Sequence, residues 1–428
     1  MSVKIQNHFM LQRYLIKREI MQQLRINKQV KGKVILMTLY LFLSSALLSD
    51  GNTPIGKYTG KDDLTKTDQK VEKVSGKSSA NAVLNKQANP MPVYGHWRNF
   101  TTKDGLPSDK AYCVRIDGER VLAGTHDGLA VYEKGKWTTY TTKDGLPHNG
   151  VVSIDVSQQT GDIWIGTLGG LCRWSAGKFE IFNQLNSGLP NDLVYCVICD
   201  GKDVWASTGG GAGHYDTYTK QWEIFTEKNA PMHEPWTYGV SAGDGKIFIA
   251  AWGGGVIEYT TKTKQFKDYT DPDGEMEIDL LPDDGLVHDI TTATSWADGI
   301  LWVSTYFGLS RYDGTHWKGY FDHDSGLASN FINFVRAKGP VVFICTDKGL
   351  SSTDGKSWVT YKKNDKRTDG MAIIKNYGRN DDPATNKTTR EMPLSPSIGH
   401  NFVIGVDANN DFLWVATEMG VSRGELLK

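Results

Sequence analysis

The sequence has few long apolar runs and, over most of its length, little positive charge. One uncharged apolar run stands out in the 428 residues, at residues 34–48, and its 15 residues are short of the roughly 20 that a bilayer-spanning helix needs. Residues 94–428 hold 33 Lys and Arg against 43 Asp and Glu. Because binding to a phosphate backbone requires clustered Lys and Arg, this acidic body argues against a nucleic-acid-binding protein.

Cysteine is also scarce, with five residues in all, and its positions exclude two common uses. No cysteine precedes Cys113, so a lipid-modified N-terminal cysteine is excluded. Cys196 and Cys199 lie three residues apart on a predicted strand, where their side chains face opposite sides of the sheet and cannot pair. We therefore expect free thiols. The sequence also lacks a nucleophile motif and a phosphate-binding loop.

The N-terminal region predicts export. Residues 34–48 follow a cluster of Lys and Arg and precede a polar segment, which is the order of a signal peptide or signal anchor. Residues 51–93 are rich in Lys, Ser, Thr, Asn and Gly and predict a flexible linker. The expected organisation is a signal region at 1–50, the linker, and a folded domain at 94–428. This predicts a periplasmic or secreted protein that contacts the membrane only through an uncleaved N-terminal segment.

An internal repeat fills the folded domain. Seven times, an aromatic or apolar residue is followed by two small or apolar residues, Thr (Ala251 in one copy), a short turn with Gly and an apolar strand. The copies begin at Leu122, Trp164, Trp205, Phe248, Trp302, Phe343 and Trp414. The steps between Thr positions are 42, 41, 43, 54, 41 and 71 residues, so four are regular and two carry insertions. A period of about 40–45 residues with four short strands, A to D, is typical of a β-propeller blade.

The two ends of the repeat array predict how the ring closes. The last unit stops after its third strand at Val421, whereas the domain opens with Trp97-Arg-Asn-Phe-Thr, which matches strand D of the other units. We therefore expect an all-β, seven-bladed propeller whose N-terminal strand completes the last blade and removes an open sheet edge. Of the two insertions, residues 271–282 are expected to form a solvated acidic loop and residues 362–397 a mobile loop.

The repeats resemble a known family. The turn Gly-Leu-Pro-x-Asn/Asp and its relatives recur at Gly105, Gly145, Gly188, Gly285 and Gly326. Together with the following Trp-x-Gly-Thr-x-x-Gly-Leu, this pattern is similar to the two-component regulator propeller repeat, which builds extracytoplasmic sensor propellers of hybrid two-component systems. The resemblance covers essentially all of residues 97–428 and implies a sensor domain. Because the chain ends at Lys428 without a kinase, we expect signalling through a separate partner.

The turns from strand D to the next strand A, and those from strand B to strand C, are predicted to line one mouth of the propeller. The last residue of the D-to-A turn is polar in every blade and is predicted to cap the turn: Asp109, Asn149, Asp192, Glu234, Asp289, Asn330 and Asn401.

The residue before this cap is His in four blades, at His148, His233, His288 and His400, and Ser or Asn in the others. Since Ser and Asn also suit the turn, these histidines are candidate ligand-binding residues. The alternative is four turn histidines too widely spaced to share a ligand. His233 and His288, with Glu234 and Asp289 beside them, form the preferred pair because blades four and five are neighbours.

Blade four departs most from the repeat and supplies aromatic candidates. Trp236 follows its turn, Ala251 replaces the repeated Thr, and Trp252 comes next. Nearby turns consist largely of Gly, which opens space, so we predict that Trp236, Trp252, Tyr306 and Phe307 stack on a sugar ring or another flat ligand. The alternative is that glycine serves the tight turn and Trp236 packs between blades.

Three functions fit these observations. The first is non-catalytic binding or sensing of a small molecule or glycan outside the cytoplasm, with a separate sensor kinase or envelope protein as partner. The second is a propeller lyase or hydrolase with a histidine-based site on one mouth, which clustered His and Glu around a divalent ion would favour. The third is a structural scaffold of the cell envelope. We prefer the first and assign no catalytic residue, cofactor or metal ligand.

Overall fold

The computed structural model of the protein describes residues 91–272, 285–376 and 388–427. The predicted signal region, most of the predicted linker and most of the acidic insertion lie outside the described residues. Within the described ranges, no helix has the length and apolar character required to span a bilayer.

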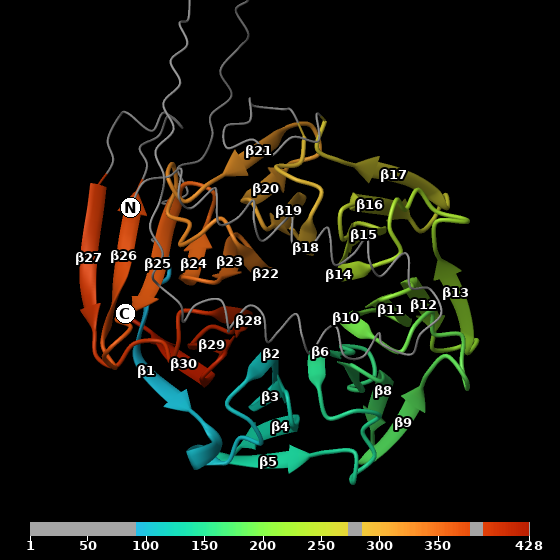
Figure 1. The fold of residues 1–428 in the computed structure, drawn as a ribbon, viewed down its shortest axis with the longest axis horizontal. Coiled ribbons are helices and arrows are strands. Elements are labelled where there is room, and N and C mark those ends of the chain that lie inside the picture. The colour runs from blue at the N-terminus through green and yellow to red at the C-terminus, as the bar shows by residue number, and fades with distance from the viewer. Residues whose placement is uncertain (1–90, 273–284, 377–387, 428) are drawn as a thin grey trace, which may run out of the picture. The chain divides into compact units, whose positions relative to one another are not determined.

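Seven antiparallel sheets surround a common centre, which confirms the seven-bladed propeller (Figure 1). Blade one is β2 (Ala111–Asp117), β3 (Arg120–Thr125), β4 (Gly128–Glu133) and β5 (Lys136–Tyr140). Blade two is β6 (Val151–Val156), β7 (Ile163–Thr167), β8 (Gly170–Ser175) and β9 (Lys178–Phe182). Blade three is β10 (Val194–Asp200), β11 (Asp203–Thr208), β12 (Gly211–Asp216) and β13 (Gln221–Phe225).

The remaining blades keep this order, with the first strand of each at the centre. Blade four is β14 (Thr237–Gly243), β15 (Lys246–Ala251), β16 (Gly255–Thr260) and β17 (Gln265–Tyr269). Blade five is β18 (Thr291–Ala297), β19 (Ile300–Thr305), β20 (Leu309–Tyr312) and β21 (Trp317–Tyr320). Blade six begins with β22 (Ile332–Lys338), β23 (Val341–Thr346), β24 (Gly349–Thr353) and β25 (Ser357–Lys363). Blade seven is β28 (Val403–Ala408), β29 (Phe412–Thr417), β30 (Gly420–Leu426) and β1 (Tyr94–Phe100), and a short 3₁₀ turn (Thr102–Asp104) follows β1.

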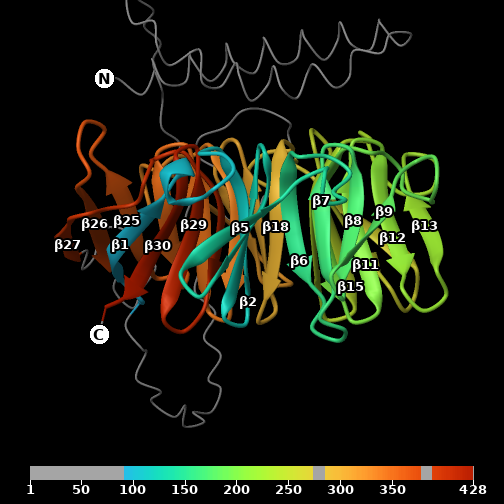
Figure 2. The same ribbon diagram turned by 90° about the horizontal axis from the view of Figure 1, so that it is seen from below.

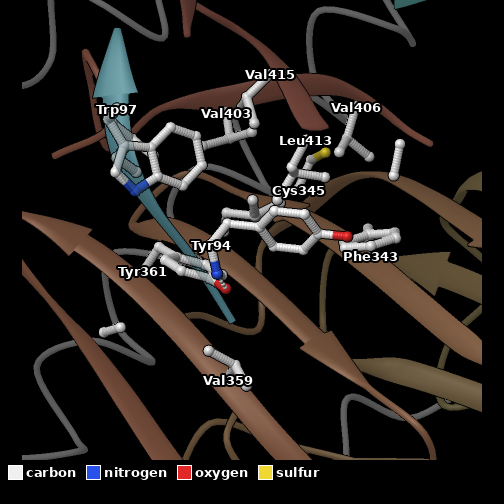
Figure 3. Packing of buried hydrophobic residues seen from close by; sticks show 14 of the residues in the cluster. Tyr94, Trp97, Phe343, Cys345, Val359, Tyr361, Val403, Val406, Leu413 and Val415 are labelled. Carbon is white, nitrogen blue, oxygen red and sulfur yellow. Dashed lines mark hydrogen bonds between the residues drawn. The ribbon is translucent and has the colours of Figure 1, made fainter. Parts of the chain in front are cut away.

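The ring closes as predicted, because β1 pairs with β30 and becomes the outer strand of the last blade. Asn99 lies opposite Ser422, and Phe100 lies opposite Val421. Trp97 is 2% exposed and meets the Tyr361 ring edge-on at 5.6 Å, so the closing strand also packs on blade six (Figure 3). Both the hydrogen-bonded edge and the apolar surface of the last blade are therefore covered.

The outer strands supply the packing between blades through a repeated aromatic pair. Two aromatic residues three positions apart occur on strand D of every blade: Trp97 and Phe100, Trp137 and Tyr140, Phe179 and Phe182, Trp222 and Phe225, Phe266 and Tyr269, Trp317 and Tyr320, and Trp358 and Tyr361. The glycine of the preceding turn allows this packing, because a Cβ on Gly188 would lie 2.4 Å from the Cβ of Trp222.

The repeated Thr at the end of strand B closes the turn to strand C. In six blades its Oγ1 donates to the carbonyl of the Gly three residues later, at 2.6 to 2.9 Å. Blade four has Ala251 at this position. There Thr291 of blade five donates to the carbonyls of Ala251 and Gly255, at 3.0 and 2.8 Å. In blade four this turn is therefore closed by a hydroxyl of the neighbouring blade.

The prediction of a mobile loop at residues 362–397 is wrong for the parts of that segment that form strands. β26 (Gly370–Asn376) and β27 (Thr388–Leu394) form a hairpin that extends blade six to six strands. β26 pairs along its whole length with β25, and Ala372 is fully buried. The Ala-Ile-Ile sequence on β26 supplies the apolar, β-branched residues that strands favour. The strand was not predicted because charged residues surround this short sequence. All five cysteines are free thiols, as predicted.

Replacing Trp97 with Ala tests the closure. We expect the free energy of unfolding to fall by about 3–5 kcal/mol, because the substitution leaves a cavity beneath the closing strand. Urea unfolding measures the loss. Y218A is the control, since Tyr218 is 64% exposed and its truncation should change stability by no more than about 0.5 kcal/mol. Equal effects of the two substitutions would contradict the closure.

Candidate functional site

One hydrogen bond, repeated in all seven blades, ties together the two turns on one face. The backbone N–H that follows strand B donates to the carbonyl that precedes strand A, at 2.8 to 3.3 Å. The donor and acceptor pairs are His126 and Lys110, Leu168 and Gly150, Gly209 and Leu193, Trp252 and Trp236, Tyr306 and Ile290, Asp347 and Phe331, and Glu418 and Phe402. The prediction that both turns share a face is confirmed (Figure 2). We call the ring formed by these seven pairs the mouth.

A β-bulge presents one more residue per blade beside the mouth. In every inner strand, the pairing with strand B shifts register around the second residue. Bulges re-aim side chains and are frequent next to functional sites. The bulged residues are Tyr112, Val152, Tyr195, Tyr238, Thr292, Asn333 and Ile404.

Five aromatic side chains contact one another in series across four neighbouring blades. Tyr195 stacks on Tyr238 with ring centroids 4.6 Å apart, and Tyr238 contacts Trp252 at 5.1 Å. Trp252 meets Tyr306 edge-on at 5.1 Å, and Tyr306 stacks on Phe331 at 3.8 Å. All five side chains are half-buried, so each keeps part of its surface accessible. We call this set the aromatic run.

The aromatic run includes two predicted site residues and three that the sequence reasoning missed. Trp252 and Tyr306 were predicted, whereas Tyr195, Tyr238 and Phe331 were not. The missed signal is the recurrence of Tyr at the second residue of strand A, which becomes informative once the bulge is known. Trp236, also predicted, lies at the mouth and is half-buried, but its ring stacks on none of the described aromatic side chains.

Additional hydrogen bonds between blades hold the backbone beneath the aromatic run. Thr237 Oγ1 accepts from the N–H of Thr208 at 2.8 Å and donates to the carbonyl of Gly211 at 3.0 Å. Thr291 serves the turn of blade four in the same way. The five other blades have Ala, Val or Ile at this position. Blades three to five therefore carry a more firmly positioned part of the mouth, which favours binding because less order is lost on ligand contact.

The predicted open space beside the aromatic residues exists in blade four but not in blade three. Gly253 follows Trp252 with φ +68°, and a Cβ there would meet nothing within 4 Å. In blade three, a Cβ on Gly210 would lie 3.1 Å from both the Asn191 Cβ and the Pro190 carbonyl oxygen. The glycines of blade three therefore serve a crowded turn, whereas Gly253 faces open space.

The histidine position of the D-to-A turn has a structural role in six blades. Its side chain accepts a hydrogen bond from the backbone N–H two residues later, at 2.8 to 3.4 Å. The acceptors are Ser108, His148, Asn191, His288, Ser329 and His400, and each histidine uses its Nδ1 atom. Ser, Asn and His are interchangeable there because each offers an acceptor at a similar reach. Burial lowers the pKa of His148 and His400.

His233 differs from its counterparts for a reason visible in the sequence. The residue two positions later is Pro235, which has no backbone N–H to donate. The His233 side chain is 62% exposed, and its Nε2 lies 3.9 Å from the Asp268 carboxylate. Among the four predicted histidines, His233 is therefore the one whose ring is not held by the described turn.

The turn-capping prediction for the next position is confirmed in six blades. The side chains of Asp109, Asn149, Asp192, Asp289, Asn330 and Asn401 each accept from a backbone N–H at the start of the turn, at 2.6 to 2.9 Å. Burial raises the pKa of Asp289, an effect that the N–H of Asp271 and the nearby His233 oppose. Glu234 is half-buried at the corresponding position of blade four.

The two histidines of the preferred pair, His233 and His288, lie in different environments. His288 is 6% exposed and stacks on Phe307 at 4.2 Å, whereas His233 is exposed and interacts with Asp268 and Asp289. His148 and His400 belong to blades two and seven, away from this pair along the ring. Among the described residues, no group of three His, Cys, Asp or Glu side chains is arranged to hold a metal ion.

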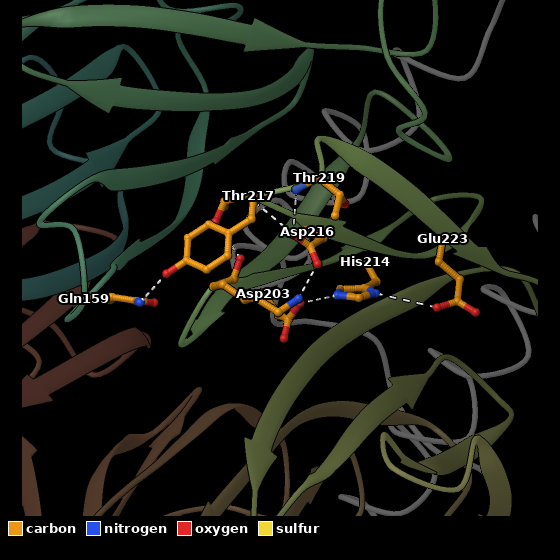
Figure 4. A network of polar contacts seen from close by, with 9 residues as sticks. Gln159, Asp203, His214, Asp216, Thr217, Thr219 and Glu223 are labelled. Carbon is orange, nitrogen blue, oxygen red and sulfur yellow. Dashed lines mark hydrogen bonds and ion pairs between the residues drawn. The ribbon is translucent and has the colours of Figure 1, made fainter.

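A separate polar network lies on blade three (Figure 4). His214 Nε2 is 2.7 Å from Asp203, and its Nδ1 is 3.6 Å from Glu223. In blade two, Arg173 occupies the same cross-strand position and pairs with two carboxylates in the same way. Because both blades place a donor between two acids at this position, the network is a stabilising feature of the sheets.

Comparison with known proteins supports the fold. No protein-family model matches the chain, and no curated protein matches it. A structure described as the extracellular domain of a hybrid two-component system from B. thetaiotaomicron is similar at a TM-score of 0.57 and 14% identity, over 77% of this chain and 41% of that one. The present chain thus spans about two fifths of that protein's structure. Virginiamycin B lyase from Staphylococcus aureus is similar at a TM-score of 0.52 and 12% identity, over 78% and 98% of the two chains. These likenesses establish a propeller fold and nothing narrower.

Replacing His288 with Asn tests its structural role through pH. Burial lowers the pKa of His288 from 6.5 to about 4, so the unfolded chain binds this proton more readily than the folded one. Stability contributed by the neutral ring is therefore complete above pH 6.5 and is lost as pH falls towards 4, by roughly 3 kcal/mol at most. Asn keeps the turn acceptor, as at Asn191, but does not titrate.

Urea unfolding between pH 4 and 7 should give a smaller loss of stability on acidification for H288N than for the unsubstituted protein. H316N is the matched control, because the His316 side chain is 66% exposed. Its pH profile should follow that of the unsubstituted protein. Parallel profiles for H288N and the unsubstituted protein would contradict the assignment.

Proposed function

We propose that the protein is a non-catalytic binding propeller that works outside the cytoplasm and recognises a ligand with a flat or ring-shaped face, such as a sugar or an aromatic compound. The observation that carries the proposal is the aromatic run, in which five half-buried rings meet in series across four blades. Aromatic faces of this kind bind sugar and aromatic rings through stacking, with specificity from nearby polar groups.

Polar groups suitable for orienting such a ligand lie next to the aromatic run. His233 is exposed on the D-to-A turn of blade four, where Pro235 frees its ring from turn capping. The two turns lie close together here, since a Cβ on Gly254 would lie 3.7 Å from the His233 Cβ and from the Glu234 nitrogen. We assign His233, Glu234 and Trp236 to the polar and aromatic border of the site. The capped residues His148, His288, Asp289 and His400 are assigned to its architecture.

The location and the partner rest on sequence features and on the fold. The apolar segment at residues 34–48 has the order of a signal region, and the fold is also that of a structure described as an extracellular domain. A sensor of this type transmits ligand binding to another protein, and we assign that role to a separate sensor kinase or envelope protein.

Ligand binding can be tested with the full chain by a thermal-shift and tryptophan-fluorescence screen against defined neutral oligosaccharides and soluble aromatic compounds. For a compound that binds, W252A and Y306A should each weaken the affinity at least tenfold, since stacking on one ring contributes about 1.4 kcal/mol or more. Y218A is the control, because Tyr218 is exposed on blade three outside the mouth and its loss should leave the affinity unchanged.

The proposal would fail if bound compounds lost no affinity in W252A and Y306A while both variants stayed folded by circular dichroism. A histidine-dependent enzyme would behave differently, because H233A would then abolish turnover of the compound without weakening its binding.

A further inference from the structure

A ring of mostly polar residues lies on the inner strands of the propeller. The fifth residue of each inner strand is Arg115, Asp155, Ile198, Ser241, Ser295, Arg336 or Asp407, in blade order. Six of these residues are polar in a wall where a propeller could place apolar side chains. Polar groups at such depth normally have defined partners.

Five of the six polar members bond to the next blade. Arg115 pairs with Asp155 at 2.6 Å, and Asp155 accepts from the N–H of Cys199 at 2.8 Å. The remaining links are Ser241 to Thr294, Ser295 to the N–H of Ala337, and Asp407 to the N–H of Ile116, each at 2.9 Å. The fifth residue of the inner strand therefore links its blade to the next one in five blades.

Arg336 is the exception. Among the described residues its guanidinium makes no hydrogen bond and no ion pair, and its Nε is fully buried without a partner. The Nε of Arg115 is buried and unpartnered in the same way. Arg336 leans over the Phe334 ring with its central carbon 5.3 Å from the centroid, which orients the guanidinium without satisfying its donors. Because a guanidinium carries five N–H groups, most of its hydrogen-bonding capacity is unused.

Arg336 lies on β22, the innermost strand of blade six (Figure 1). Burial raises the pKa of Cys113, Cys196 and Cys345, and the positive charge of Arg336 opposes that rise at all three thiols. These cysteines belong to blades one, three and six.

Three cations of the inner strands act on one buried carboxylate, Asp407. Asp407 is fully buried and is shared by Lys338 at 3.0 Å and Arg115 at 3.7 Å. Although burial favours its neutral form, Arg336, Arg115 and Lys338 hold the pKa of Asp407 below its ordinary value. The inner strands also carry Asp117, Asp155 and Asp200, and among their cations in the described residues Arg336 is the one without a direct ion pair.

We infer that Arg336 binds a small oxyanion, a phosphate or the carboxylate of a small acid, at the centre of the propeller. A planar guanidinium matches a two-oxygen acceptor and binds it through parallel hydrogen bonds. This site is independent of the aromatic run, so either can fail without the other.

The test uses the full chain and three probes at constant ionic strength: inorganic phosphate, sodium acetate and sodium chloride. Phosphate or acetate should raise the melting temperature along a saturable curve, because a ligand that binds only the folded state stabilises it. Chloride should do so far less, since it offers no paired oxygens. A response to phosphate alone identifies a free phosphate site, and a response to acetate alone identifies a carboxylate site.

R336M should weaken the apparent affinity for the active anion at least tenfold. R311M is the matched control, because Arg311 is a partly exposed arginine that lies over Trp302 and pairs with Asp313 away from the inner wall. It should keep the full response. R336K should fold with the same net charge and bind the anion weakly, because an ammonium lacks the forked donors.

Phosphorus NMR line broadening of inorganic phosphate gives a second readout that does not depend on stability. The inference is supported if broadening and the melting shift both disappear in R336M and persist in R311M. It is overturned if the unsubstituted protein responds equally to all three salts, or if R336M and R336K, both folded, respond to phosphate and acetate as the unsubstituted protein does.

Discussion

The mouth depends on the hydrogen bond between the N–H that follows strand B and the carbonyl that precedes strand A. Its presence in all seven blades means that both turns are set by backbone atoms and not by particular side chains. Side chains at these positions are consequently free to vary from blade to blade. Blades four, five and six place Trp236, Trp252, Tyr306 and Phe331 there, whereas blade one places Lys110 and His126. The same backbone frame thus carries aromatic side chains in some blades and polar side chains in another.

Blade four shows how local departures from the repeat create a site. Ala251 lacks the hydroxyl that closes the turn in the other blades, and Thr291 of blade five supplies it, which couples the two blades. Pro235 removes the N–H that would hold the His233 ring. These changes release one side chain and strengthen the backbone around it. Ring closure by β1 keeps this arrangement in register around the whole disc.

Much of the fold could be predicted from the sequence, because blade number, strand order and ring closure follow from a period and from matching ends. The site could be predicted only in part. Comparison of the repeats identified Trp252 and Tyr306 as candidates. Tyr195 and Tyr238 were missed because their placement depends on a β-bulge, and no particular residue type marks that bulge in the sequence. The histidines of the D-to-A turns were predicted to bind a ligand because Ser or Asn occupies the same position in other blades. All three residue types in fact accept the same backbone hydrogen bond. The β26–β27 hairpin was missed because charged residues flank the few apolar residues of its strands.

Hydrogen–deuterium exchange of the full chain, with and without the tightest-binding ring compound, is the most direct measurement of where the ligand lies. The account predicts slower exchange in peptides that contain Trp236 to Tyr238, Trp252 to Gly254 and Tyr306, with little change in the turns of blades one and two. Slower exchange confined to the opposite face, in the turns between strands A and B or between strands C and D, would contradict it.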